Sequence, residues 1–241
     1  MDTALPKLSP RLAAVAAEIV PGSRVADIGT DHGRLPLWLA ASGLAAYCLA
    51  TEKSVALLAR VARAGAGAPW SRRLAYRAGD GLEAIRPGDR IDTIVIAGLG
   101  GRTIVRILDT AAGRSPMLTR LALQPRSETA LARRWLSEHG WRPVSERLTE
   151  DCRRTHVTIA AERGRDSDLY RDDALSREDL LAAGPLLARS GAPEVALVWR
   201  VERDRLASIL ARPGSGPSIA RARAGYDRAV RILAAISTRG G

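Results

Sequence analysis

The amino-acid sequence predicts an α/β fold, a doubly wound and mostly parallel sheet, followed by a smaller helical module. Up to about residue 162, short apolar runs rich in β-branched residues alternate with segments whose apolar residues recur at helical spacing. Glycines or carboxylates follow several of the predicted strands. After residue 162 the sequence becomes polar and then helical. We therefore expect two domains, residues 1–162 and residues 163–241.

The first half of the sheet domain begins with a helix. Ser9 is suited to cap this helix, Pro10 fits its first position, and the helical pattern continues to Val20, before Pro21 and Gly22 interrupt it. The elements expected next are a strand at 23–29, a helix at 35–41, a strand at 46–51 and a helix at 55–64.

The second half of the domain repeats this alternation. Strands are expected at 74–77, 91–97 and 120–124, and helices at 103–110 and 128–139. The run 91–97 is typical of a strand buried on both faces. Two last strands, 141–148 and 155–160, are expected to form an antiparallel pair at the end of the sheet.

The second domain is expected to contain an antiparallel, coiled-coil-like helical hairpin. Apolar residues between Val195 and Leu210 follow a helical period, and a second helical stretch covers 218–236. The Pro- and Gly-rich segment 212–217 between them is a turn. Two amphipathic helices joined by a short turn pack against each other.

Composition narrows the classes of function. The chain has 37 Lys and Arg against 26 Asp and Glu, a formal net charge of +11, which favours a phosphate-rich partner. No apolar run approaches the length of about 18 residues that a membrane helix needs. Cys48 and Cys152 are too few for a disulfide framework or a zinc site. Residues 1–8 lack the layout of a signal peptide. We expect a cytoplasmic protein with no metal.

The strongest local signal is the loop that follows the first strand, Asp27-Ile28-Gly29-Thr30-Asp31-His32-Gly33. A dinucleotide site needs three glycines in a G-x-G-x-x-G pattern, and here Asp31 stands two residues after Gly29. The carboxylates of Asp27 and Asp31 would repel a pyrophosphate. S-adenosylmethionine fits better because it carries a sulfonium and an ammonium group and no phosphate.

Polar or glycine-rich turns also end the next three parallel strands. Glu52 stands where nucleoside-binding folds place an acid on the ribose hydroxyls, although a carboxylate at a helix start is an equal alternative. Asp80 is placed to accept from an adenine amino group. The glycines of the segment 98–101 exceed what a turn needs. Because the strands are parallel, these turns should meet at one edge of the sheet.

Several segments resemble the bacterial TrmK family, the S-adenosylmethionine-dependent methyltransferases that modify N1 of adenine 22 in tRNA. They are 8–12 (Leu-Ser-Pro-Arg-Leu), 25–36 (Val-Ala-Asp-Ile-Gly-Thr-Asp-His-Gly-Arg-Leu-Pro), 91–101 and 123–125. The resemblance extends into the second domain through the segment 184–187, Trp199 and Glu202. It implies a Rossmann-like class I methyltransferase sheet. Two departures stand out: Arg34 replaces a frequent aromatic residue, and Thr155-His156 replaces a Tyr-Glu pair.

Carried over position by position, the resemblance implies two sets of site residues. The predicted cofactor contacts are Asp27, Gly29, Thr30, Asp31, His32, Glu52, Lys53, Asp80, Gly81, Ala97 and Gly98. The residues predicted to border the target base are Arg34, Leu99, Gly100, Gly101, Gln124 and Pro125.

N1 of a neutral adenine has a lone pair, so alignment with the methyl group is the main catalytic requirement. We expect Asp31 to stabilise the positive charge of the product, and His32 to orient the Asp31 carboxylate or the base. With no Phe and 4% aromatic residues, base stacking would fall to Arg34, Arg102 or Arg126. The tRNA partner would be bound by the hairpin arginines, namely Arg200, Arg203, Arg205, Arg221, Arg223 and Arg228.

The alternatives are a methyltransferase of the same fold acting on another RNA or a small molecule, and a non-catalytic RNA-binding relative. We expect a monomer or weak dimer.

Overall fold

The computed structural model describes residues 7–110, 117–164, 168–212 and 215–239. The chain divides into two compact units, residues 1–164 and residues 165–241, a division two residues beyond the one expected from the sequence. In the described part of the chain, no helix is both long and apolar enough to cross a membrane.

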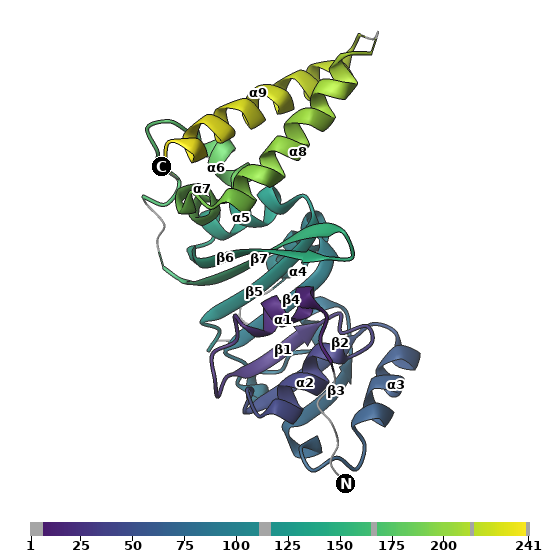
Figure 1. Ribbon diagram of the computed structural model, residues 1–241. Helices are drawn as coiled ribbons and strands as arrows, with labels where there is room; N and C mark the ends of the chain where they lie inside the picture. The colour runs from purple at the N-terminus through teal and green to yellow at the C-terminus, as the bar shows by residue number, and fades with distance from the viewer. Residues whose placement is uncertain (1–6, 111–116, 165–167, 213–214, 240–241) are drawn as a thin grey trace. The chain divides into compact units, whose positions relative to one another are not determined.

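Within the described residues, the first unit contains a seven-stranded sheet with the order β3-β2-β1-β4-β5-β7-β6 (Figure 1). Strands β1 to β5 are parallel, and β7 runs antiparallel to both β5 and β6. The chain order reverses between β1 and β4, the place where a doubly wound sheet forms a crevice at its carboxyl edge. The strands are β1 Arg24–Ile28, β2 Tyr47–Glu52, β3 Leu74–Ala78, β4 Thr93–Gly100, β5 Arg120–Ser127, β6 Trp141–Asp151 and β7 Arg154–Arg163.

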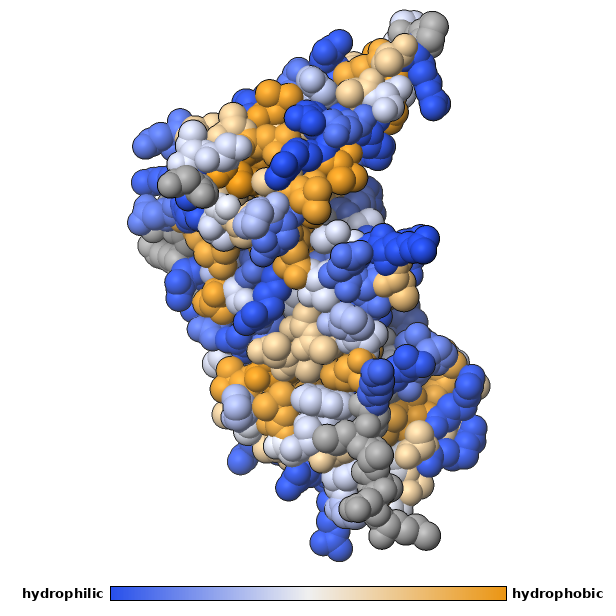
Figure 2. Space-filling model, in the orientation of Figure 1, coloured by the Kyte–Doolittle hydropathy of each residue, from blue (hydrophilic) through white to orange (hydrophobic). Residues whose placement is uncertain are grey.

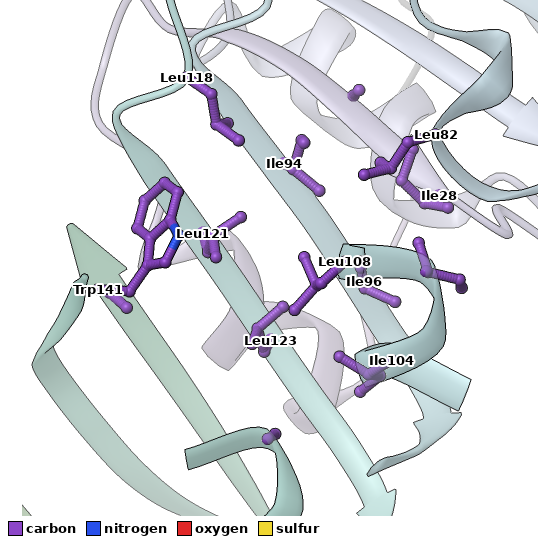
Figure 3. Packing of buried hydrophobic residues seen from close by; sticks show 14 of the residues in the cluster. Ile28, Leu82, Ile94, Ile96, Ile104, Leu108, Leu118, Leu121, Leu123 and Trp141 are labelled. Carbon is purple, nitrogen blue, oxygen red and sulfur yellow. The ribbon is translucent and has the colours of Figure 1, made fainter. Parts of the chain in front are cut away.

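Helices cover both faces of this sheet because the central strands are apolar on both sides. Ile94 and Ile96 of β4 pack with α4 (Gly101–Asp109) and α5 (Thr129–Glu138) in the cluster drawn in Figure 3. Val95, between them, faces the other cluster, with α1 (Pro10–Ala16), α2 (Arg34–Ser42) and α3 (Val55–Gly65). Successive side chains of the strand therefore point into the cores on opposite faces of the sheet. The mostly parallel α/β fold is thereby confirmed.

Several predicted element boundaries were wrong, among them the end of the first helix and the end of β4. The first helix ends at Ala16 and not at Val20, because the N–H groups of Glu18 and Ile19 bond carbonyls only three residues back. The segment 98–101, expected to be a turn, continues β4 to Gly100, and α4 starts at Gly101. A Cβ on Gly101 would lie 2.3 Å from the Glu128 carbonyl oxygen, so close backbone packing explains that glycine.

The strands β6 and β7 are longer than expected and form a hairpin. Its turn consists of Cys152 and Arg153, whose φ angles of 51° and 61° are both positive. Positive φ at both central residues matches the right-handed twist of the flanking strands.

The second unit is helical throughout its described residues apart from turns and short irregular connections. Two short helices, α6 (Arg177–Ala183) and α7 (Pro185–Ser190), precede the hairpin and were missed as helices in the sequence. Ser176 and Asp179 form a capping box at the start of α6, a signal that was present in the sequence.

The hairpin itself comprises α8 (Pro193–Leu210) and α9 (Pro217–Ser237), as expected. Hydrophobic and hydrophilic side chains alternate along its surface in Figure 2. Leu206 of α8 and Ala229 and Ile232 of α9 are buried, whereas Leu197 and Val201 of α8 are exposed.

Candidate functional site

A cavity of about 730 Å³ opens at the carboxyl ends of the parallel strands of the first unit. It lies at the edge where the predicted strand-end residues meet. Every residue predicted to contact the cofactor lines it, and so do two of those predicted to border the base: Asp27, Gly29, Thr30, Asp31, His32, Arg34, Glu52, Lys53, Asp80, Gly81, Ala97, Gly98 and Leu99.

Asp27, near the end of β1, is a buried carboxyl at the floor of this cavity. Its side chain is 5% exposed, and burial raises its pKa to about 6. The Thr30 hydroxyl partly offsets that rise, and the negative charge of Glu52 adds to it. None of the described residues pairs a basic group with Asp27, and a buried carboxylate in this state favours the approach of a cationic ligand.

The loop after Asp27 is held by backbone hydrogen bonds and by a close contact with α3. The N–H groups of Gly29 and Thr30 both donate to the Thr51 carbonyl, at 3.0 and 2.9 Å. Gly33 has φ of 66°, and a Cβ there would lie 2.1 Å from a Val61 methyl group. Only glycine fits this position, which seats the loop directly on α3.

Glu52, at the end of β2, holds the same loop from the other side. One carboxylate oxygen accepts from the Asp31 N–H at 3.3 Å, and the other accepts from the Ser54 N–H at 3.1 Å, just before α3. Of the two roles considered for Glu52, ribose ligand or carboxylate at a helix start, the second is therefore observed. It also lines the cavity, and each oxygen has a further lone pair for a hydroxyl donor.

The remaining predicted cofactor residues lie around the rim. Lys53 Nζ and Asp80 Oδ2 are 2.7 Å apart, and both side chains are about half exposed. A pair this exposed contributes at most about 1 kcal/mol to stability and is easily exchanged for a ligand contact. Asp31 and His32 are more exposed still, with Oδ1 and Nδ1 3.6 Å apart.

Four residues predicted to border the base do not line the cavity: Gly100, Gly101, Gln124 and Pro125. Gln124 is fully buried beneath it. Its Oε1 accepts from the Gly98 N–H at 3.1 Å and from Arg11 Nη1 at 2.8 Å, and its Nε2 donates to the Pro125 carbonyl at 3.3 Å. With both ends of its amide engaged, Gln124 positions Gly98 and Arg11.

Sequence reasoning missed several residues that line the cavity, chiefly those from α1 and α4. They are Ser9, Arg11, Leu12, Thr103, Arg106 and Ile107. Ser9 and Arg11 also interact with Asp151 at the tip of the β6–β7 hairpin, where the Ser9 hydroxyl is the main cause that lowers the pKa of Asp151. The motif 8–12 was visible in the sequence, but nothing in its spacing predicted that α1 closes one side of the site.

Comparison with known proteins first shows the class of protein to which the chain belongs. Residues 8–159 match the family model described as a methyltransferase domain. A curated relative then identifies the family within this class. The tRNA (adenine(22)-N(1))-methyltransferase of Bacillus subtilis strain 168 is 31% identical over 203 residues, 84% of each chain. The chain belongs to this bacterial TrmK family, which confirms the resemblance seen in the sequence.

Solved structures agree with this assignment. The crystal structure of B. subtilis TrmK, an m1A22 tRNA methyltransferase, superposes with a TM-score of 0.81 at 26% identity and covers 98% of this chain and 100% of that one. Streptococcus pneumoniae Sp1610 in complex with S-adenosyl-L-methionine gives a TM-score of 0.79 at 26% identity, covering 98% and 100%.

Proposed function

We propose that the protein transfers a methyl group from S-adenosylmethionine to N1 of adenine 22 in tRNA. The observation that carries this proposal is the cavity lined by Asp27, Glu52 and Asp80 at the carboxyl edge of the sheet, in a chain of the TrmK family. Other RNAs and small molecules are less well supported, because the B. subtilis relative, which matches 84% of this chain, and the solved TrmK structure, which matches 98% of it, are named as m1A22 enzymes.

The residues present fit S-adenosylmethionine. When bound, this cofactor supplies an electrophilic methyl group on a sulfonium. Asp27 would hold its ammonium group, Glu52 its ribose hydroxyls and Asp80 its adenine amino group, because each is a carboxylate acceptor on the cavity wall. Gly29 and Gly98 have φ of 71° and 79°, and their lack of a Cβ leaves room for the ligand.

Asp31 and His32 are our candidates for catalytic residues. Both are exposed on the cavity rim, where an entering base would meet them. N1 attacks with its own lone pair, so no proton has to be removed first. The Asp31 carboxylate would stabilise the positive charge that develops on the adenine ring, and His32 would orient that carboxylate.

The rest of the tRNA needs a larger basic surface. A net charge of +11 supports binding of a polyanion, and we assign part of it to the arginines of α8 and α9. The protein would act on tRNA in the cytoplasm. Its oligomeric state, a monomer or weak dimer, and its independence of metal stay predictions.

The test is methylation of an unmodified tRNA transcript with labelled S-adenosylmethionine, followed by mapping of the nucleotide by mass spectrometry. We expect one methyl group at adenine 22, none on a transcript with guanine at that position, and a rate that falls steeply with salt. Asp31→Asn should lower kcat more than cofactor affinity. Methylation elsewhere, or only of small molecules, would refute the proposed substrate.

A further inference from the structure

A second, smaller cavity adjoins the cofactor cavity. It has a volume of about 340 Å³, at the lower end of the range of roughly 300–1,000 Å³ for ligand pockets. Asp31, His32 and Arg34 line both cavities, so the two are neighbours along the rim. The other walls come from α3, and we call this space the α2–α3 cavity; its further lining residues are Leu57, Arg60, Val61 and Ala64.

The floor of the α2–α3 cavity is fixed by packing. Val61 is 2% exposed and fills the space that a side chain at position 33 would need. The Gly33 loop and α3 are therefore packed directly against each other. This packing fixes the space between the start of α2 and the exposed face of α3. Above the buried Val61, Leu57 and Ala64 give the cavity an apolar wall.

Its rim is basic. Arg34 and Arg60 are exposed and have neither an ion pair nor a side-chain hydrogen bond within the part of the chain that the structure describes. Some other arginines of the sheet unit are paired instead: Arg77 binds Asp89, and Arg102 binds Glu128 at 2.8 Å. The one carboxylate in the lining, Asp31, lies beside His32.

We propose that the α2–α3 cavity binds a nucleotide that flanks the target adenine, with its phosphate on Arg34 and Arg60 and its base against Leu57 and Ala64. This inference rests on the proposed function. Guanidinium groups match phosphate oxygens in geometry and charge, and a flat base covers an apolar wall. The cavity adjoins the rim where the methylated base would enter, so the RNA chain passes from one cavity to the next.

The test compares variants at exposed positions of α3 in the full-length protein. Arg60→Gln removes the rim charge, and Arg63→Gln is its matched control, because Arg63 is exposed on the same helix but does not line the cavity. Ala64→Trp keeps both arginines and fills the cavity. Binding of unmodified tRNA is measured by fluorescence anisotropy at several salt concentrations, and S-adenosylmethionine binding by calorimetry.

We expect Arg60→Gln to weaken tRNA binding roughly five- to tenfold near 0.1 M salt and to lower the salt slope by about 0.7–0.9. Ala64→Trp should weaken binding with the slope unchanged, and the cofactor affinity should stay constant in all three variants. Equal effects of Arg60→Gln and Arg63→Gln, or a silent Ala64→Trp, would overturn the proposal. Either result leaves the methylation of adenine 22 by the parent protein intact, so the two proposals fail separately.

Discussion

Two buried aspartates, one in each unit, have opposite electrostatic surroundings. Asp27 in the sheet unit is 5% exposed, and burial raises its pKa to about 6. Asp179 in the helical unit is 1% exposed. Burial alone would raise its pKa too, but hydrogen bonds from Arg231 and from the Ser176 hydroxyl lower it below the usual value.

The difference separates a structural carboxylate from a ligand-binding one. Asp179 caps α6 and binds α9 through Arg231, so its negative charge is compensated within the fold. Within the part of the chain that the structure describes, Asp27 has no such cation, and its ionised form costs stability. A protein that keeps such a group at a cavity floor sacrifices stability for affinity toward a cationic ligand.

Substituting both aspartates tests this comparison and should give the largest effects. Asp27→Asn should weaken S-adenosylmethionine binding by about 30- to 1,000-fold, because truncating a buried charge partner costs about 2–4 kcal/mol. The same change should raise the free energy of unfolding at pH 7 by about 1–3 kcal/mol, since the pKa is raised from 3.8 to about 6. Asp179→Asn should instead destabilise the protein by about 2 kcal/mol or more and leave cofactor affinity unchanged. Calorimetry and urea unfolding measure the two quantities.

The pH dependence of stability and of cofactor affinity tests the same role of Asp27, because the two quantities should change in opposite directions. Because the folded pKa of Asp27 lies above its unfolded value, this group costs stability above about pH 6, and the cost disappears as the pH falls toward 4. Affinity for the cationic cofactor should change in the opposite sense, falling by up to tenfold per pH unit below pH 6. Asp27→Asn should remove that slope. An unchanged slope in the variant would show that another group binds the ammonium.

The arginines of the hairpin allow the next comparison, between compensated and uncompensated charges. Three of the six predicted to bind tRNA pair with carboxylates: Arg203 with Asp204, Arg205 with Glu202 and Arg228 with Asp179. The other three, Arg200, Arg221 and Arg223, have no ion pair among the residues that the structure describes. The charge of a paired guanidinium is compensated by its carboxylate, so it attracts phosphate less strongly than an unpaired one.

Replacing Arg200, Arg221 and Arg223 with Gln should therefore weaken tRNA binding by roughly 10- to 100-fold near 0.1 M salt and lower the salt slope by about 2–3. Arg203→Gln with Arg205→Gln is the control and should have less effect for each charge removed. Cofactor affinity, measured by calorimetry, should be the same in both variants. A larger loss in the control would mean that the pairs open on binding and that the α8 carboxylates do not compete with RNA.

The sequence predicted the sheet, the hairpin and the strand-end residues because their signals are local. Period-two patterning places Val95 and Ile96 on opposite faces, and parallel strands bring Asp27, Glu52 and Asp80 to one edge. What it did not predict depends on distant contacts. The approach of Arg11 to the site is fixed by Gln124, 113 residues away, and the role of Gly101 depends on the backbone of Glu128.

Gln124 is a buried polar side chain next to the cavity. Its hydrogen-bonding groups have partners within the fold, as the charge of Asp179 does. Gln124→Leu leaves the Gly98 N–H and the Arg11 guanidinium without their shared acceptor, so we expect the free energy of unfolding to fall by about 1–3 kcal/mol. Methylation should slow only a few-fold, because Gln124 does not line the cavity. Gln124→Glu keeps the acceptor oxygen and pairs with Arg11 but loses the donor to the Pro125 carbonyl, so it should retain more activity than Gln124→Leu. If both variants lost turnover equally while stability was unchanged, Gln124 would contact the base directly. Its hydrogen bonds within the fold would then be replaced by contacts with the base when the substrate binds.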